Sequence, residues 1–182
     1  MSLVTISFKS KCFNRNITYR AIIPTEHLAH QKDPKPFKTL YLLHGMFGNC
    51  EDWVAQTRVK RLAEAVIMPS GDNSFYVDHY NRYDYYGEFS GHKLVEHSRN
   101  LFPLSRKRED TFIARLSMEG YGAVRNGPKY HQTFSHIAGL SSAFILNEAI
   151  NASEEHEVFF RTKSYFESIF EDTTKRLGSD ND

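Results

Sequence analysis

Apolar and polar residues alternate in segments along this chain, and the segments predict strands and helices in turn. Residues 4–8 and 17–23 alternate apolar with polar side chains, which is typical of strands, and the polar residues 14–16 between them predict a hairpin turn. Residues 39–43 form a continuous apolar run, and residues 66–68 form a shorter one. Runs of this kind predict strands that are buried on both faces.

The remaining pattern predicts further strands at 111–116 and 135–140, with helices between them. The expected helices are 53 to about 63 with Asp52 as N-cap, 86–102 with Leu94 and Val95 on its inner face, a helix ending near 130, and one near 165–170. Strands that alternate with helices favour a mostly parallel sheet with helices on both faces. The first hairpin would form its antiparallel edge.

One predicted connection is unusually short. The helix expected to end near residue 63 is followed almost at once by the strand at 66, whereas such a connection takes about 2–6 residues. Either a small local deletion or a helix that ends about one turn earlier would explain the spacing.

Composition narrows the possible classes of protein. The 182 residues predict one domain, and 23 Lys and Arg against 22 Asp and Glu argue against nucleic-acid or membrane binding driven by net charge. No apolar run approaches the ~18–20 residues of a membrane span, and the start of the chain does not resemble a signal peptide. Cys12 and Cys50 lack metal or disulfide spacing, so we expect reduced thiols and a cytoplasmic location.

A serine follows the strand predicted at 111–116 and precedes a predicted helix. The segment reads Arg-Leu-Ser-Met-Glu-Gly from Arg115, with Ser117 in the position of a nucleophile elbow, the strand–turn–helix in which a catalytic serine is held at a sheet edge. Both positions where the G-x-S-x-G pattern has glycine are charged, Arg115 and Glu119. A charged side chain forced into that close backbone contact would cost about several kcal/mol unless it turns outward.

A serine nucleophile needs donors for the oxyanion as well as a base. The backbone N–H of Met118 is one expected donor, and the loop that starts with His44 and Gly45 supplies the other from Met46. We interpret His44 as support for this loop and not as the base. The sequence gives no metal site and no phosphate-binding glycine pattern.

Together these segments resemble the esterase D branch of the α/β-hydrolases, which includes tributyrin esterases and enzymes similar to S-formylglutathione hydrolase. The segments that carry the resemblance, which covers nearly the whole chain, are 41–49, 66–76, 107–114, 117–123 and 134–141. The resemblance implies an α/β-hydrolase fold and short acyl esters as substrates. It also implies a two-step serine esterase mechanism with an acyl-enzyme at Ser117 and no cofactor.

The chain departs from that family in three respects, one of which is the short connection before residue 66. The family has glycine where Arg115 and Glu119 stand, and its triad acid and base follow two further strands that we do not find after Ser117. We therefore expect a single, C-terminally truncated domain, 1–182, whose last strands and helices are missing. Its core would be about 1–142, and 143–182 would form a partial cap or tail.

Two functions stay open at this point. The chain is either an esterase impaired by Arg115, Glu119 and the absent acid and base, or an inactive remnant that binds an acyl ligand or a protein partner. Three histidines follow Ser117; we interpret His131 and His136 as structural, and His156 as a residue that could approach the serine. The expected partner is a small acyl ester, and an exposed sheet edge would favour self-association.

Overall fold

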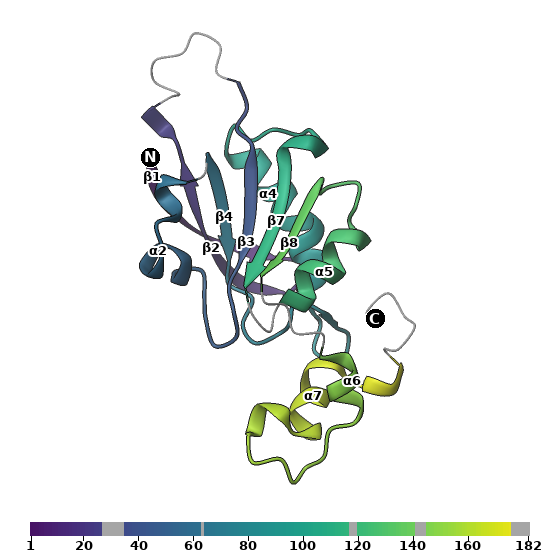
Figure 1. The fold of residues 1–182 in the computed structure, drawn as a ribbon. Coiled ribbons are helices and arrows are strands. Elements are labelled where there is room, and N and C mark those ends of the chain that lie inside the picture. Colours follow the sequence, from purple (N-terminus) through teal and green to yellow (C-terminus); the bar gives the residue numbers. More distant parts are fainter. Residues whose placement is uncertain (27–34, 63, 117–119, 141–144, 176–182) are drawn as a thin grey trace.

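The fold is a six-stranded sheet with helices on both faces, seen in a computed structural model that describes residues 1–26, 35–62, 64–116, 120–140 and 145–175 (Figure 1). The strands lie in the order β1-β2-β4-β3-β7-β8. The antiparallel pairs are β1–β2 and β2–β4, and β3 is parallel to both β4 and β7, as β7 is to β8. The strands are β1 (Ser2–Ser10), β2 (Arg15–Ile23), β3 (Thr39–Leu43), β4 (Ala65–Pro69), β7 (Thr111–Leu116) and β8 (His136–Leu140). The predicted mostly parallel sheet with an antiparallel hairpin at one edge is confirmed.

The hairpin turn lies earlier than the sequence predicted. Ser10 pairs with Arg15, so Arg15 and Asn16 belong to β2 and the turn occupies residues 11–14. Asn14 has a φ of 51°, in the left-handed region that asparagine tolerates better than most residues.

Each strand sends alternate side chains to opposite faces of the sheet. On one face, Leu42 and Val66 pack with Trp53 of the short helix α2 (Asp52–Gln56). On the other face, Tyr41 and Ile67 pack with the long helical segment behind the sheet. That segment comprises α3 (Tyr86–Glu88), the π-helix η2 (Phe89–Lys93) and α4 (Leu94–Leu101), and α5 (Gly120–Lys129) packs against β7, β8 and η2.

The long helical segment confirms the helix predicted at 86–102. Leu94 and Val95 are buried, as expected for its inner face. The π-helical turn in its first half is a feature that the sequence did not predict. Within this turn the Ser90 hydroxyl donates to the carbonyl of Tyr86 at 2.8 Å.

The helix predicted from 53 to about 63 is wrong in its length. Helix α2 ends at Gln56, because Thr57 is extended (φ −137°, ψ 174°). The Thr57 hydroxyl donates to the carbonyl of Trp53 and accepts the backbone N–H of Val59 at 3.2 Å. These local bonds replace helical ones. A 3-10 turn, η1 (Val59–Arg61), follows, so the early end of α2 leaves room for the connection to β4.

The predicted N-cap of this helix is also wrong. Glu51 is the N-cap residue, and it makes no side-chain capping bond. The Asp52 carboxylate instead accepts the backbone N–H of Asn49 at 3.2 Å, three residues before it. Asp52 therefore fixes the loop before the helix.

The last described segment forms a second apolar cluster, away from the sheet (Figure 1). Helix α6 (Leu146–Ile150), which was not predicted, and α7 (Lys163–Phe170), which was, pack on Phe75, Val77 and Tyr121. The Thr162 hydroxyl caps α7 by accepting the backbone N–H of Tyr165. Short 3-10 turns are η3 (Arg108–Asp110), η5 (Phe159–Arg161) and η6 (Thr173–Lys175). Phe75 and Val77 follow β4, and Met46, which packs against the cluster, follows β3. The cluster therefore lies at the carboxyl end of these strands, where a hydrolase site is expected.

Strand β8 is the outermost strand on its side of the described sheet. All five of its residues are exposed, and Ile137 and Leu140 are 40% and 50% accessible. An exposed edge was expected from the sequence. In the parts of the chain that the structure describes, no helix is long and apolar enough to cross a membrane.

Candidate active site

The candidate site lies where β3 and β7 end side by side. Leu43, the last residue of β3, pairs with Arg115 of β7. Strands β3 and β7 therefore end at the same edge of the sheet, just before His44 and shortly before Ser117 in the sequence. Ser117, Met118 and Glu119 lie outside the described residues, so the candidate nucleophile and one expected oxyanion donor have no described geometry.

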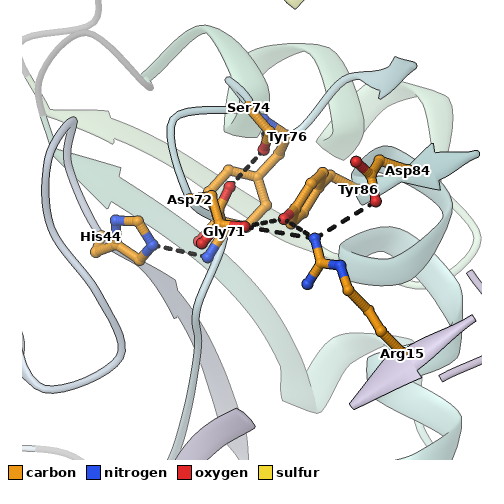
Figure 2. Close-up of polar contacts among 8 residues, drawn as sticks. All are labelled: Arg15, His44, Gly71, Asp72, Ser74, Tyr76, Asp84 and Tyr86. Atoms are coloured by element: carbon orange, nitrogen blue, oxygen red, sulfur yellow. Dashed lines mark hydrogen bonds and ion pairs between the residues drawn. The ribbon is translucent and has the colours of Figure 1, made fainter. Parts of the chain in front are cut away.

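His44 is buried beneath its own loop, at 1% exposure. Its Nε2 accepts the backbone N–H of Gly71 at 2.8 Å (Figure 2). Its Nδ1 lies 2.7 Å from the carbonyl oxygen of Gly45. An Nε2 that accepts carries no proton, so the ring is neutral and donates through Nδ1. Burial lowers the pKa of His44, which favours the same neutral form. Both ring nitrogens are engaged, which fits support of the loop better than proton transfer from a serine.

Residues 44–49, which we name the oxyanion loop after their expected role, form a tight turn beyond His44. The backbone N–H of Gly48 donates to the carbonyl of Gly45 at 3.1 Å, and that of Phe47 donates to the Asn73 side chain at 2.8 Å. A Cβ at Gly48 would lie 2.0 Å from the Asp52 carboxylate and 3.0 Å from the backbone carbonyl oxygen of Gly45, so this close approach favours glycine. Met46, the expected donor, lies half-buried between these fixed points.

The loop that carries Gly71 is held by a polar cluster (Figure 2). Arg15 donates through Nη2 to the Tyr86 hydroxyl at 2.9 Å and lies 3.4 Å from Asp84 and 3.5 Å from Asp72. The Tyr86 hydroxyl in turn donates to Asp72. Burial raises the pKa of Tyr86 above its usual range, so the phenol keeps the proton that it donates.

A cavity of about 200 Å³ opens beside this cluster. The cluster residues line it together with Asn73 and Ser74, and α7 closes it with Tyr165, Ser168 and Ile169. Asn73 also binds the backbone N–H of Phe47, so one wall of the cavity continues into the oxyanion loop.

Arg115 turns inward from the end of β7. Its side chain is fully buried, and its Cζ lies 3.9 Å from the ring centroid of Tyr76. A Cβ at Gly122 would lie 1.9 Å from Arg115 Nη1 and 2.6 Å from the carbonyl oxygen of Phe75. The guanidinium therefore occupies space that α5 leaves open only because residue 122 is glycine. The side chain of Arg115 therefore does not turn outward, which the sequence analysis considered as the way to avoid this cost.

The three histidines after Ser117 each have a ring nitrogen near a local partner. His131 Nδ1 lies 3.0 Å from the carbonyl of Pro128, and His136 Nδ1 lies 3.0 Å from the Ser135 hydroxyl. His156 is exposed, and its Nδ1 accepts the backbone N–H of Val158 at 3.0 Å.

The sequence did not single out a histidine–carboxylate pair that the structure places at the cavity. His79 Nδ1 lies 3.3 Å from the Glu171 carboxylate, and His79 lines the cavity. The two residues lie far apart in the chain, so no local motif could have shown them together.

Metal and thiol chemistry find no support in the described residues. They contain no group of three or more His, Cys, Asp or Glu side chains that could hold a metal ion. Cys12 and Cys50 are both buried thiols, and burial raises the pKa of Cys12 to about 11, which keeps it protonated and unreactive at neutral pH.

Comparison with known proteins identifies the family. The model of the esterase family described as "Putative esterase" matches residues 10–169. An acetyl esterase from Caldicellulosiruptor saccharolyticus is 40% identical over an alignment of 190 residues that covers 100% of this chain and 71% of the relative.

Solved structures agree with this match. The serine hydrolase FphF of Staphylococcus aureus, named as fluorophosphonate-binding, has a TM-score of 0.82 and 28% identity, over 100% of this chain and 70% of that one. The S-formylglutathione hydrolase FrmB of the same organism has a TM-score of 0.77 and 25% identity, with the same coverage. The fold is thus that of the α/β-hydrolases. By sequence and by fold, the chain belongs to the esterase family whose model matches residues 10–169.

Proposed function

We propose that this protein is a carboxylic-ester hydrolase that acts on short-chain acyl esters through an acyl-enzyme at Ser117. The observation that carries the proposal is the oxyanion loop after β3, held by both ring nitrogens of His44 beside the end of β7. A preorganised loop of this kind stabilises the charge that develops on the ester carbonyl oxygen. The acetyl esterase relative favours a small acyl group.

The chemistry follows from the expected roles. The Ser117 hydroxyl attacks the ester carbonyl, and its proton passes to a base that we do not assign. The backbone N–H groups of Met46 and Met118 stabilise the oxyanion, while His44 and Gly45 support the loop. Collapse of the tetrahedral intermediate releases the alcohol, and water then hydrolyses the acyl-enzyme. No metal or organic cofactor takes part.

A second candidate function is binding of an acyl ligand or a protein partner without turnover. Arg115 favours it, because a buried cation stands where the family has the first elbow glycine. A side chain there alters the support of the turn that presents the serine, and Glu119 replaces the second glycine. Under this second function, the two changes leave a fold that binds an acyl ligand but does not hydrolyse it.

The proposal also includes the location of the protein, its self-association and the kind of partner it binds. The buried thiols Cys12 and Cys50 favour a reducing, cytoplasmic location. The exposed edge of β8, with Ile137 and Leu140 accessible, favours self-association of two copies. The substrate itself is a small molecule, and neither a nucleic acid nor a membrane is an expected partner.

The test combines a fluorophosphonate probe with hydrolysis of p-nitrophenyl acetate. We expect the probe to label Ser117, as seen by mass spectrometry, and Ser117→Ala to abolish both labelling and hydrolysis. Ser153→Ala, at an exposed serine of the C-terminal segment, is the matched control and should change neither. Labelling without hydrolysis above the Ser117→Ala background would favour the binding function. No labelling at Ser117 would overturn the nucleophile assignment.

A further inference from the structure

Four aromatic rings form a partly exposed group beside the oxyanion loop. Phe47 comes from that loop, and Phe159, Phe160 and Tyr165 come from η5 and α7; we name this group the aromatic platform. The ring centroids of Phe47 lie 6.2 Å from Phe159 and 5.8 Å from Phe160, and Phe159 lies 5.7 Å from Tyr165. Phe47 and Phe159 are 58% and 62% exposed. Contiguous exposed apolar side chains of this kind mark ligand or partner sites.

The backbone at Phe47 has a φ of 62°, which is uncommon for a bulky residue. Asparagine or glycine would adopt this conformation at lower cost, and strain of this kind concentrates at ligand-binding sites. The Asn73 side chain stabilises it by accepting the Phe47 backbone N–H. The conformation directs a large apolar ring into solvent, so burial of Phe47 in the core does not account for it.

The platform is continuous with the candidate site. Phe47 directly follows Met46, the expected oxyanion donor. The Tyr165 hydroxyl donates to the sulfur of Met46 at 3.4 Å, and Tyr165 also lines the cavity beside the loop. A group attached to a carbonyl at Met46 is therefore within reach of the platform rings.

The charged residues near the platform in the chain and the geometry of its rings favour a neutral, aromatic ligand. The exposed residues Glu154, Glu155 and Glu157 precede Phe159 in the chain, while the cations Arg161 and Lys163 already lie 3.4 Å from Glu148 and 3.7 Å from Glu167. This balance of charge disfavours an anionic ligand. The Phe159 and Phe160 rings meet edge to face, at 84°, and so present both an edge and a face to a third ring. Aromatic rings prefer such offset or edge-to-face partners.

We propose that the aromatic platform binds the aryl group of a neutral ester while its carbonyl lies at the oxyanion loop. The inference rests on the proposed function and deepens it, because it assigns the substrate class as aryl esters of short acids. The platform would hold the aryl group through ring contacts, which make it selective for flat rings over aliphatic groups of similar size.

The test uses a ligand that cannot be hydrolysed. Methyl 2-naphthyl ketone carries a carbonyl and an aryl group but no ester bond, and methyl 2-decahydronaphthyl ketone is its saturated counterpart with the same carbon skeleton. Binding to the Ser117→Ala protein is measured by titration with NMR detection. We expect the naphthyl ketone to bind at least about tenfold more tightly than the decahydronaphthyl ketone, a ratio that corresponds to one or two aromatic contacts.

The variants locate the binding. Phe159→Ser and Phe47→Asn, the latter compatible with the positive φ, should each weaken naphthyl ketone binding about tenfold. Leu101→Ser, at a residue 53% exposed on α4, is the matched control and should leave it unchanged. Equal binding of the two ketones, or unchanged binding in both platform variants, would overturn the proposal.

The outcome is separable from that of the proposed function. Naphthyl ketone binding that depends on Phe159, without probe labelling of Ser117 in the unaltered protein, would support the platform and reject the esterase. Labelling of Ser117 together with naphthyl ketone binding that is unchanged in Phe159→Ser would support the esterase and reject the platform.

Discussion

The two strand ends that meet at the candidate site hold their polar groups in different ways. After β3, His44 is neutral, and both of its nitrogens meet backbone groups of the loops that it joins. At the end of β7, Arg115 is charged and buried, and it stacks on Tyr76 at 3.9 Å. The first arrangement fixes the proposed oxyanion loop with a neutral side chain, while the second packs a cation between Tyr76 and α5, two residues before Ser117. Under the proposed function, the loop after β3 therefore fits its expected role, whereas Arg115 departs from the glycine expected before the serine.

The largest expected effect comes from Arg115→Gly, which restores the family residue. The fully buried side chain leaves a void between Tyr76 and α5, so we expect the free energy of unfolding to fall by about 3–5 kcal/mol. Arg115→Met keeps most of the volume and removes the cation–π contact, which predicts a smaller loss of about 1–2 kcal/mol. Urea denaturation of both variants measures the difference. Equal losses would mean that charge, and not volume, decides the role of Arg115.

Gly122→Ala tests the other side of the same contact. The added Cβ would overlap Arg115 Nη1 and the carbonyl oxygen of Phe75, and the backbone oxygen cannot move away easily. We expect a loss of about 2–3 kcal/mol, again by urea denaturation. In the Arg115→Met background the loss should shrink, because the more flexible side chain can yield. Simple additivity of the two changes would argue against direct contact.

His44→Phe tests the oxyanion side. The variant keeps an aromatic ring but leaves the buried N–H of Gly71 without its acceptor, so we expect a loss of about 1–3 kcal/mol. His44→Gln offers an oxygen acceptor and should recover part of it. If the two variants are equally destabilised, packing of the ring and not its hydrogen bonds supports the loop.

The smallest effect is a dependence of stability on pH. Burial lowers the pKa of both His44 and His97 from a usual value of 6.5. Below about pH 6.5 the unfolded chain binds protons at these positions that the folded chain does not bind, so stability should fall as the pH drops from 7.5 to 5.5. Urea midpoints at the two pH values measure this. The loss of stability between pH 7.5 and 5.5 should be smaller in His44→Phe. If the loss is the same in that variant, His44 does not contribute to the pH dependence.

The strands were the most predictable part of the fold. Residues 39–43 are strand β3 as predicted, because a strand buried on both faces favours a continuous apolar run. Residues 111–116 are strand β7 as predicted, although Thr111 and Arg115 interrupt its apolar residues. The end of α2 was not predictable from periodicity. The Thr57 hydroxyl bonds to the carbonyl of Trp53 and accepts from Val59, and these local bonds ended a helix that the apolar pattern would have continued.

The candidate site was predictable only in part. The loop at His44 could be located because it follows a buried strand, but the acceptor role of His44 toward Gly71 depends on a loop from another strand. The inward turn of Arg115 depends on Tyr76 and on the missing side chain of Gly122, neither of which a pattern at residue 115 contains. The aromatic platform joins residue 47 to residues 159–165 and has no local signature.

The parallel pairing of β3 with β7 has a consequence for how the site assembles during folding. The β1–β2 hairpin closes a short loop and can form early, whereas Thr39 meets Thr111 only after a long stretch of chain has been closed. The oxyanion loop and the elbow segment are therefore separate until that long-range contact exists. Any partly folded form that contains the hairpin alone lacks the site, and the appearance of ester or probe binding during refolding would report on the late, non-local step.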